Sequence, residues 1–211
     1  AGNVVRHKAM TLRAKKAKLK SKKVNRMFAI RHKRMNMVRA YTSGAMRYSA
    51  MVNGIPPRIV KQVRPQLHRS IAKNTGGSAT VLLALQRNRW IDPWYDAATI
   101  APIAWAKNVY AADKAINRMQ SRAWMNHKAK VMIADDPWSE VRGPCTATYA
   151  TIHKYGWTMP AWHTFRTNSG ETLDLRETTP HVVQKKLRED VSDRLWNDAM
   201  FNAGFDYHEG T

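Results

Sequence analysis

The chain has 211 residues, a formal net charge of +21 and 44% hydrophobic residues. This composition is too apolar for a wholly disordered chain, and the length suffices for one domain with a buried core. No apolar run approaches the ~20 residues that span a bilayer. The single cysteine, Cys145, excludes an internal disulfide and a zinc site made of several cysteines.

The charge is distributed unevenly along the chain. The first 91 residues contain 22 Lys and Arg and no Asp or Glu, and the first carboxylate is Asp92. The remaining 120 residues contain 14 basic and 15 acidic side chains. Because a surface of one sign cannot neutralise itself with its own ion pairs, we expect a polyanionic partner, most commonly nucleic acid. A solvated basic face and an anionic membrane are the alternatives, and the second is disfavoured because the basic segments lack a continuous apolar face.

The first segment, residues 1–23, carries nine basic residues and few large apolar ones. Its lack of acidic residues is typical of transit peptides, but we favour a basic extension that belongs to the mature protein. Such a segment would be a flexible arm in water. We therefore expect it to become ordered in a polyanionic groove.

Helical patterns follow in the acid-free part. Apolar residues near helical spacing predict a helix over residues 24–50. A stripe made of Ile59, Val63, Leu67 and Ile71 predicts another helix, which Pro65 should kink or break. The Asn-Thr-Gly-Gly run at residues 74–77 should end it, and Ser78 should cap a further helix with core residues at 81–85.

The second part begins with Asp92-Pro93, a helix-start signal that recurs as Asp136-Pro137. We predict helices beginning near residue 93, over about 111–131, over 144–155, and from Thr179-Pro180 onward. A hairpin is expected over about residues 162–175. The predicted fold is mainly α, a helical bundle-like domain with one small β-hairpin and a long basic N-terminal extension; a mixed α+β architecture is the alternative.

Four regions follow from these patterns. Residues 1–23 are a basic RNA-binding extension, residues 24–91 a basic helical region, residues 92–201 a near-neutral helical region with the hairpin, and residues 202–211 a tail. We find no internal repeat.

Residues that could carry chemistry give weak signals. Asp135-Asp136 looks like the paired aspartates of a polymerase palm, but no carboxylate precedes Asp92, so helix capping is the favoured reading. The eight histidines lack metal-ligand spacing and are expected at the surface or on phosphates. Cys145 is expected to be a buried thiol near a helix start. We therefore predict no enzyme activity, no cofactor and no metal.

The sequence allows two roles for the eight tryptophans, which are packing in the core and stacking on unpaired bases. Trp162 and His163, on the expected hairpin, are the best candidates for exposed aromatic residues. No motif that reads RNA sequence is present, so binding should address backbone and shape.

Ordered short motifs carry a resemblance to a known family. In the first part they are Tyr41-Thr42-Ser43-Gly44, Val52-Asn53-Gly54-Ile55-Pro56-Pro57, Val63-Arg64, Leu85, Asp92-Pro93 and Ile103-Ala104-Trp105-Ala106. In the second they are Trp138-Ser139-Glu140-Val141-Arg142-Gly143-Pro144, Tyr155-Gly156-Trp157, Ser169-Gly170-Glu171-Thr172-Leu173-Asp174-Leu175 and Thr179-Pro180. Over about residues 35–200 the chain resembles the segment after the palm in dinoflagellate and perkinsid non-LTR retrotransposon reverse transcriptases.

The resemblance implies a helical, nucleic-acid-handling remnant without fingers, palm or catalytic aspartates. That lineage is notable for mitochondrial ribosomes built on fragmented rRNA. We therefore predict a retrotransposon-derived, RNA-binding ribosomal protein of the mitochondrion, whose partners are rRNA and other ribosomal proteins within a ribonucleoprotein that serves translation. No small-molecule substrate and no membrane are expected. The alternatives are a retroelement polymerase part that works with a separate palm subunit, and a DNA-packaging protein.

The residues predicted to contact phosphates are the basic residues of the acid-free part, which should act without reading sequence. They are Arg6, Lys8, Arg13, Lys15, Lys16, Lys18, Lys20, Lys22, Lys23, Arg26, Arg31, Lys33, Arg34, Arg39, Arg47, Arg58, Lys61, Arg64, Arg69 and Lys73.

Overall fold

The computed structural model describes residues 2–27, 31–38, 40, 44–47, 50–71 and 92–202. The described chain is mainly helical with one small antiparallel sheet, which confirms the predicted fold class. Its helices in the acid-free part are α1 (Gly2–Arg26), α2 (Arg31–Met37), α3 (Gly44–Arg47), α4 (Ala50–Asn53) and α5 (Pro57–Ile71). The second part contains α7 (Pro93–Tyr110), α8 (Lys114–Ile133), the 3₁₀ helix η3 (Pro137–Glu140), α9 (Pro144–Lys154) and α10 (Pro180–Asn202).

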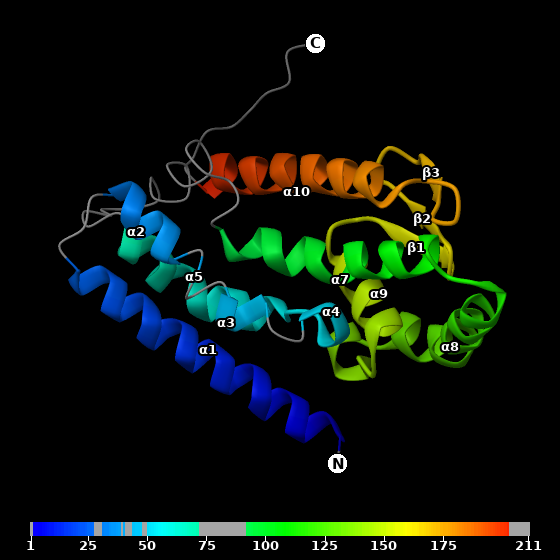
Figure 1. Cartoon of the computed structure of the whole chain (residues 1–211), viewed down its shortest axis with the longest axis horizontal. Coiled ribbons are helices and arrows are strands. Elements are labelled where there is room, and N and C mark those ends of the chain that lie inside the picture. Colours follow the sequence, from blue (N-terminus) through cyan, green and yellow to red (C-terminus); the bar gives the residue numbers. More distant parts are fainter. Residues whose placement is uncertain are drawn as a thin grey trace, which may run out of the picture.

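Helix α7 lies at the centre and joins two hydrophobic clusters (Figure 1). It packs against α10 and α9 in the second part and against α4 and α5 in the acid-free part. One cluster contains the buried residues of α1 to α5 together with Ala97 of α7. The other gathers side chains of α7, α9, the sheet and α10. Trp94, at the start of α7, packs against both clusters, so the two parts share one core element.

Aspartates begin three helices of the second part, α7, α8 and η3, two of them at the predicted Asp-Pro signals. The Oδ1 atom of Asp92 accepts a hydrogen bond from Trp94 N at 2.9 Å, and Asp136 caps η3 in the same way at 3.0 Å from Trp138 N. The capping reading of Asp136 is thereby confirmed. On α10 the predicted stripe of Val183, Leu187, Val191 and Leu195 is buried. Spacing of three to four residues places such a stripe on one face of the helix, toward the core.

The sheet has three strands in the order β1 (Thr158–Ala161), β2 (Thr164–Arg166) and β3 (Thr172–Asp174). Strands β2 and β3 pair with Phe165 opposite Leu173, which confirms the predicted hairpin. The prediction of only two strands is wrong, because β1 adds an antiparallel edge strand with an irregular register. Its Pro160 argues against a strand in sequence, but an edge strand tolerates a residue that lacks the backbone N–H donor.

A further prediction needs correction. The single helix over residues 24–50 is wrong, since the helices described there are the end of α1 and the short helices α2, α3 and α4. Helix α5 continues through Pro65, so of the two predicted effects the break does not occur, and the kink stays a prediction. Pro65 lies on the exposed side of α5, where water can solvate the carbonyl that loses its partner. The helix predicted after Ser78 lies outside the described residues.

Most of the described tryptophans are core residues. Trp105, Trp124 and Trp157 are buried, and Trp94, Trp138 and Trp162 are half-buried against the hydrophobic clusters. The remaining described tryptophan, Trp196, is 37% exposed. Over the described ranges, no helix is long and apolar enough to cross a membrane.

Candidate nucleic-acid interface

Helix α1 packs on α5 through one narrow face. Met10, Ala14, Ala17, Ser21 and Val24 recur at intervals of three and four residues and are all buried. The three small side chains in this set let the backbones of α1 and α5 approach closely, as small residues do at other helix interfaces. The Ser21 hydroxyl donates to the carbonyl of Gln66 at 2.9 Å, which ties the two helices by a polar contact.

This packing concerns the predicted extension, because residues 2–23 form most of α1. In the structure this segment is a helix against α5, and burial of its narrow apolar face accounts for its order. Whether it also acts as an extension within a larger assembly stays a prediction.

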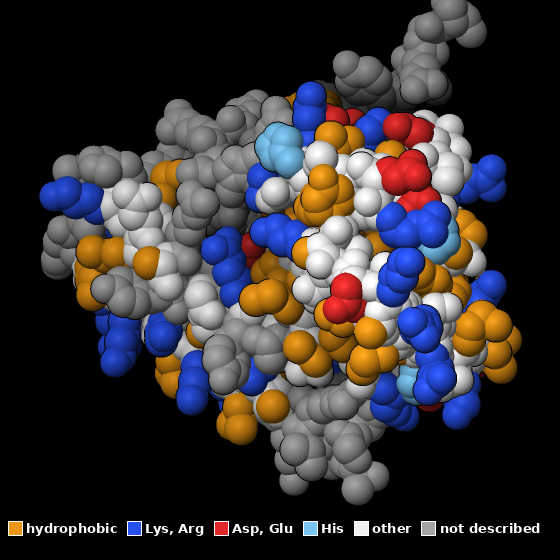
Figure 2. All heavy atoms as spheres, turned by 45° about the vertical axis from the view of Figure 1, so that its right-hand side comes forward, with side chains coloured by type: hydrophobic (Ala, Val, Ile, Leu, Met, Phe, Trp, Pro, Cys, Tyr) orange, Lys and Arg blue, Asp and Glu red, His pale blue; other side chains and the backbone are white. Residues whose placement is uncertain are grey.

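The rest of α1 presents basic side chains to solvent. Lys15, Lys16, Lys20, Lys22, Lys23 and Arg26 are exposed, and the helix contains no acidic residue. In Figure 2 the Lys and Arg side chains at the lower left have no Asp or Glu among them, whereas acidic side chains gather at the upper right. The solvent-exposed face of α1 is therefore a surface of one charge sign.

Helix α5 adds a second basic stripe. Its exposed residues are Arg58, Lys61, Gln62, Pro65 and Arg69, whose spacing places them on one face, opposite the buried Ile59, Val63 and Leu67. Because α1 packs beside α5, the two stripes belong to neighbouring helices. We call the exposed basic residues of α1 and α5 named here the basic face.

Two predicted phosphate contacts are instead engaged within the chain. Arg47 Nε lies 2.8 Å from Asp96 Oδ2, and Arg64 lies 2.8 Å from Asp92 Oδ2 through both Nε and Nη2. These carboxylates are the first two of the chain, so they fasten the acid-free part to α7. The structure thus removes Arg47 and Arg64 from the predicted set.

Asp92 is the centre of this connection. Its side chain is fully buried, caps α7 through Oδ1, and lies 3.3 Å from His68 Nε2 through Oδ2. Burial alone would raise the pKa of Asp92, but the contact with His68 and the charge of Arg64 outweigh it and hold this pKa below its usual value. The expectation that histidines lie at the surface is wrong for His68, which is 5% exposed.

The other predicted residues divide by exposure. Arg34 is buried, with Nε and Nη1 unpartnered among the described residues, so it cannot present its guanidinium to a partner in this conformation. Arg13 and Lys18 are half-buried. Exposed residues are Lys15, Lys16, Lys20, Lys22, Lys23, Arg26, Lys33, Arg58, Lys61 and Arg69. The side chains of Arg6, Lys8 and Arg31, and the whole of Arg39 and Lys73, lie outside the described parts.

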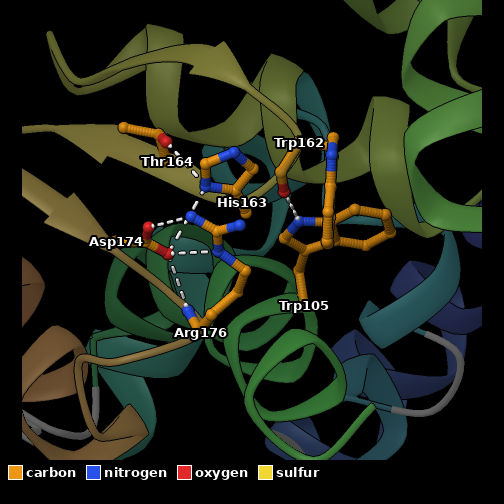
Figure 3. A network of polar contacts seen from close by, with 6 residues as sticks. All are labelled: Trp105, Trp162, His163, Thr164, Asp174 and Arg176. Atoms are coloured by element: carbon orange, nitrogen blue, oxygen red, sulfur yellow. Dashed lines mark hydrogen bonds and ion pairs between the residues drawn. The ribbon is translucent and has the colours of Figure 1, made fainter. Parts of the chain in front are cut away.

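A polar network on the sheet is the nearest approach to a catalytic arrangement (Figure 3). His163 Nδ1 lies 3.0 Å from Thr164 Oγ1 and 3.4 Å from Asp174 Oδ1. A nucleophile–base–acid relay needs the hydroxyl and the carboxylate on opposite ring nitrogens, whereas here both address the same nitrogen. Asp174 is also held by Arg176, whose hydrogen bond is the main cause that lowers the pKa of Asp174 to about 2. The network therefore does not form such a relay.

The expected exposed pair on the hairpin is only half-exposed. Trp162 packs against the core and its carbonyl accepts a hydrogen bond from Trp105 Nε1 at 2.8 Å. The side chain of His163 is 23% exposed and meets the Trp162 ring edge to face. Neither residue offers a free stacking surface in this conformation.

Cys145 is buried, and the described acidic and histidine side chains form no metal-binding cluster with it. Burial raises the pKa of Cys145 to about 12, as expected for an inert thiol. His153 stacks on Tyr149 with ring centroids 5.7 Å apart. Within the described ranges, no three His, Cys, Asp or Glu side chains are placed to hold a metal ion.

Helix α8 is a basic surface that sequence reasoning missed. Residues 114–133 contain five Lys and Arg and no Asp or Glu, and all but one of the five are exposed. They are Lys114, Arg118, Arg122, Lys128 and Lys130. The sequence contains this acid-free run of basic residues. The net charge of the second part as a whole is near zero, so the charge distribution along the chain did not indicate it.

Comparison of the chain with protein-family models, with curated proteins and with solved structures finds no match.

Proposed function

We propose that the protein is a structural RNA-binding protein that holds folded RNA through phosphate contacts of its basic face. The observation that carries this proposal is the composition of α1 and α5, whose exposed sides present Lys and Arg and no carboxylate. The acidic residues nearest in sequence, Asp92 and Asp96, are engaged with Arg64 and Arg47. A polyanion is the partner whose binding releases counterions and relieves the repulsion between these charges.

We favour RNA over a reacting substrate because the basic face offers phosphate contacts, whereas the two candidates for chemistry among the described residues are weak. The network around His163 has the wrong geometry for a relay, and Cys145 is buried with a raised pKa. A rigid helical pair that displays fixed cations suits backbone and shape recognition. We further propose that the RNA is rRNA of a mitochondrial ribosome, which rests on the resemblance to retrotransposon reverse transcriptases alone.

The test removes three positive charges from the basic face and compares the effect on RNA binding with that of removing three positive charges from another part of the surface. Lys16, Lys20 and Lys23 lie on one exposed side of α1, and their triple replacement by Gln preserves helix propensity. The matched control is the triple Gln replacement of exposed Lys107, Lys154 and Lys185 in the second part. Each lost phosphate contact should lower the salt slope of binding to a folded RNA by about one.

We expect the α1 variant to lower the slope by about two to three and the control variant by less than about one. Fluorescence anisotropy with a labelled RNA duplex at about 0.05 to 0.2 M salt provides the slopes. Equal effects of the two triple variants would contradict the basic face as the binding surface. Binding that survives RNase but is lost on DNase treatment of the natural complex would favour the DNA-packaging alternative.

A further inference from the structure

A cavity of about 400 Å³ lies between α8 and the start of α9, away from the basic face. Trp105, Ile116 and Met119 supply much of its apolar wall, and Ala123 leaves space on the same side of α8. Cys145 and Thr146, in the first turn of α9, close another side. This volume falls in the range of small-molecule sites, and the exposed Ile116 and Met119 in its wall leave it open to solvent.

Gln120 places a buried polar group at the cavity wall. This residue lines the cavity, is only 9% exposed, and its Oε1 atom is itself buried and has no hydrogen-bond partner among the described residues. A buried amide oxygen without a partner costs free energy, so a turn of the amide that brings this oxygen to a donor of an occupant is favoured. Rotation of the amide lets the side chain present its oxygen and its nitrogen together to one planar ligand edge.

The rim of the cavity carries basic side chains, of which Arg142 is already paired, with its Nη2 3.7 Å from Glu140 Oε2. His127 and Arg142 line it, and Lys130 follows His127 at the spacing that places both on one side of α8. Figure 2 shows Lys and Arg side chains interspersed with hydrophobic ones at the lower right, where α8 lies. The first residues of α9, from the N-cap Gly143 to Thr146, line the cavity, so the positive end of this helix lies beside it.

We propose that this cavity takes one unpaired adenine base of the bound RNA, with the adjoining phosphates on the α8 rim. Adenine fits because a Gln amide pairs with its N6 donor and N7 acceptor, while the apolar wall receives the ring faces. A hydrophobic side chain of a protein partner would leave Gln120 unpaired and would not use the basic side chains of the rim. The inference deepens the proposed RNA-binding function and depends on it.

The test compares binding of the full chain to labelled oligo-A and oligo-U of equal length, and to adenosine monophosphate. We expect oligo-A to bind roughly 5- to 100-fold more tightly than oligo-U at fixed salt, the range of one good amide–base pair. Gln120→Leu, which conserves size at a buried site, should abolish this preference, as should Ala123→Phe, which fills the cavity. The matched control Gln62→Leu alters an exposed amide on α5 and should retain the preference.

Each outcome decides the proposal. A preference for oligo-A that Gln120→Leu removes and Gln62→Leu retains supports it. Equal, salt-dependent binding of both oligomers overturns the base site but leaves the phosphate-binding function intact. Binding of adenosine monophosphate without binding of any RNA overturns both, because the cavity would then serve a free nucleotide.

Discussion

Replacing Asp92 by Ala should destabilise the protein more than any other change of a single carboxylate among the described residues. Asp92 is fully buried and accepts two contacts of 2.8 Å from Arg64, whose side chain is 22% exposed. Removing one partner of a buried pair costs 3–5 kcal/mol, and the partial exposure of Arg64 favours the lower end, about 3 kcal/mol. Loss of the α7 cap adds about 1 kcal/mol. The sum of about 4 kcal/mol corresponds to a fall in Tm of about 8–16 °C for a chain of this size.

Two other variants separate the contributions. Asp92→Asn retains a good capping side chain and removes the charge, so its cost should be about 3 kcal/mol. Asp96→Ala removes the partner of Arg47, which is 39% exposed, and should cost about 1 kcal/mol or less. Thermal unfolding followed by circular dichroism measures all three. A Tm for Asp92→Ala within two or three degrees of that for Asp96→Ala would refute the idea that this buried carboxylate fastens the two parts.

The same carboxylate predicts a dependence of stability on pH. The pKa of Asp92 is lowered in the folded state, so its stabilising contribution is complete above the unfolded value of about 4. The contribution should be lost as pH falls through the lower folded pKa. The stability difference between the wild type and Asp92→Asn should therefore shrink below about pH 4.

Three further predictions follow from close packing and burial. Gly54→Ala should lower the free energy of unfolding by about 2 kcal/mol or more, because Gly54 has φ +62° and a Cβ there would lie 2.6 Å from Trp138 Cζ3. Denaturant titration measures the loss, and Gly44→Ala, where the Cβ would meet open space, is the control. Ala17→Leu should cost about 1–3 kcal/mol by overpacking α1 against α5, seen as faster amide exchange in α1. Cys145 should react with a maleimide at pH 8 about a thousand-fold more slowly than a free thiol, since its pKa is about 12; unfolding should restore the rate.

The helices of the second part could be predicted because local signals specify them. Asp92-Pro93 provides a cap and a favourable first residue, and the α10 stripe from Val183 to Leu195 repeats at helical spacing. The hairpin between β2 and β3 was equally local, since its turn residues are adjacent in sequence. Such features depend on neighbouring residues rather than on tertiary packing.

The features that could not be predicted from the sequence depend on tertiary contacts. The local sequence does not indicate that residues 2–26 form a helix that packs on α5. The contact face of this helix contains Ala14, Ala17 and Ser21, and three small side chains form only a weak apolar stripe. The pairing of Arg64 with Asp92 joins residues 28 positions apart and removes a cation from the predicted set. The cavity of Gln120 arises between α8 and α9, so composition alone could not reveal it.

The most direct test of the central claim, that the chain is a structural component of an RNA-containing particle, is sedimentation of a native organelle extract. The extract is separated on a sucrose gradient with and without RNase, and the chain is followed by mass spectrometry. The proposal predicts co-migration with a ribosomal subunit and its loss on RNase treatment. Migration away from ribosomes, or co-migration that RNase leaves unchanged, would contradict it.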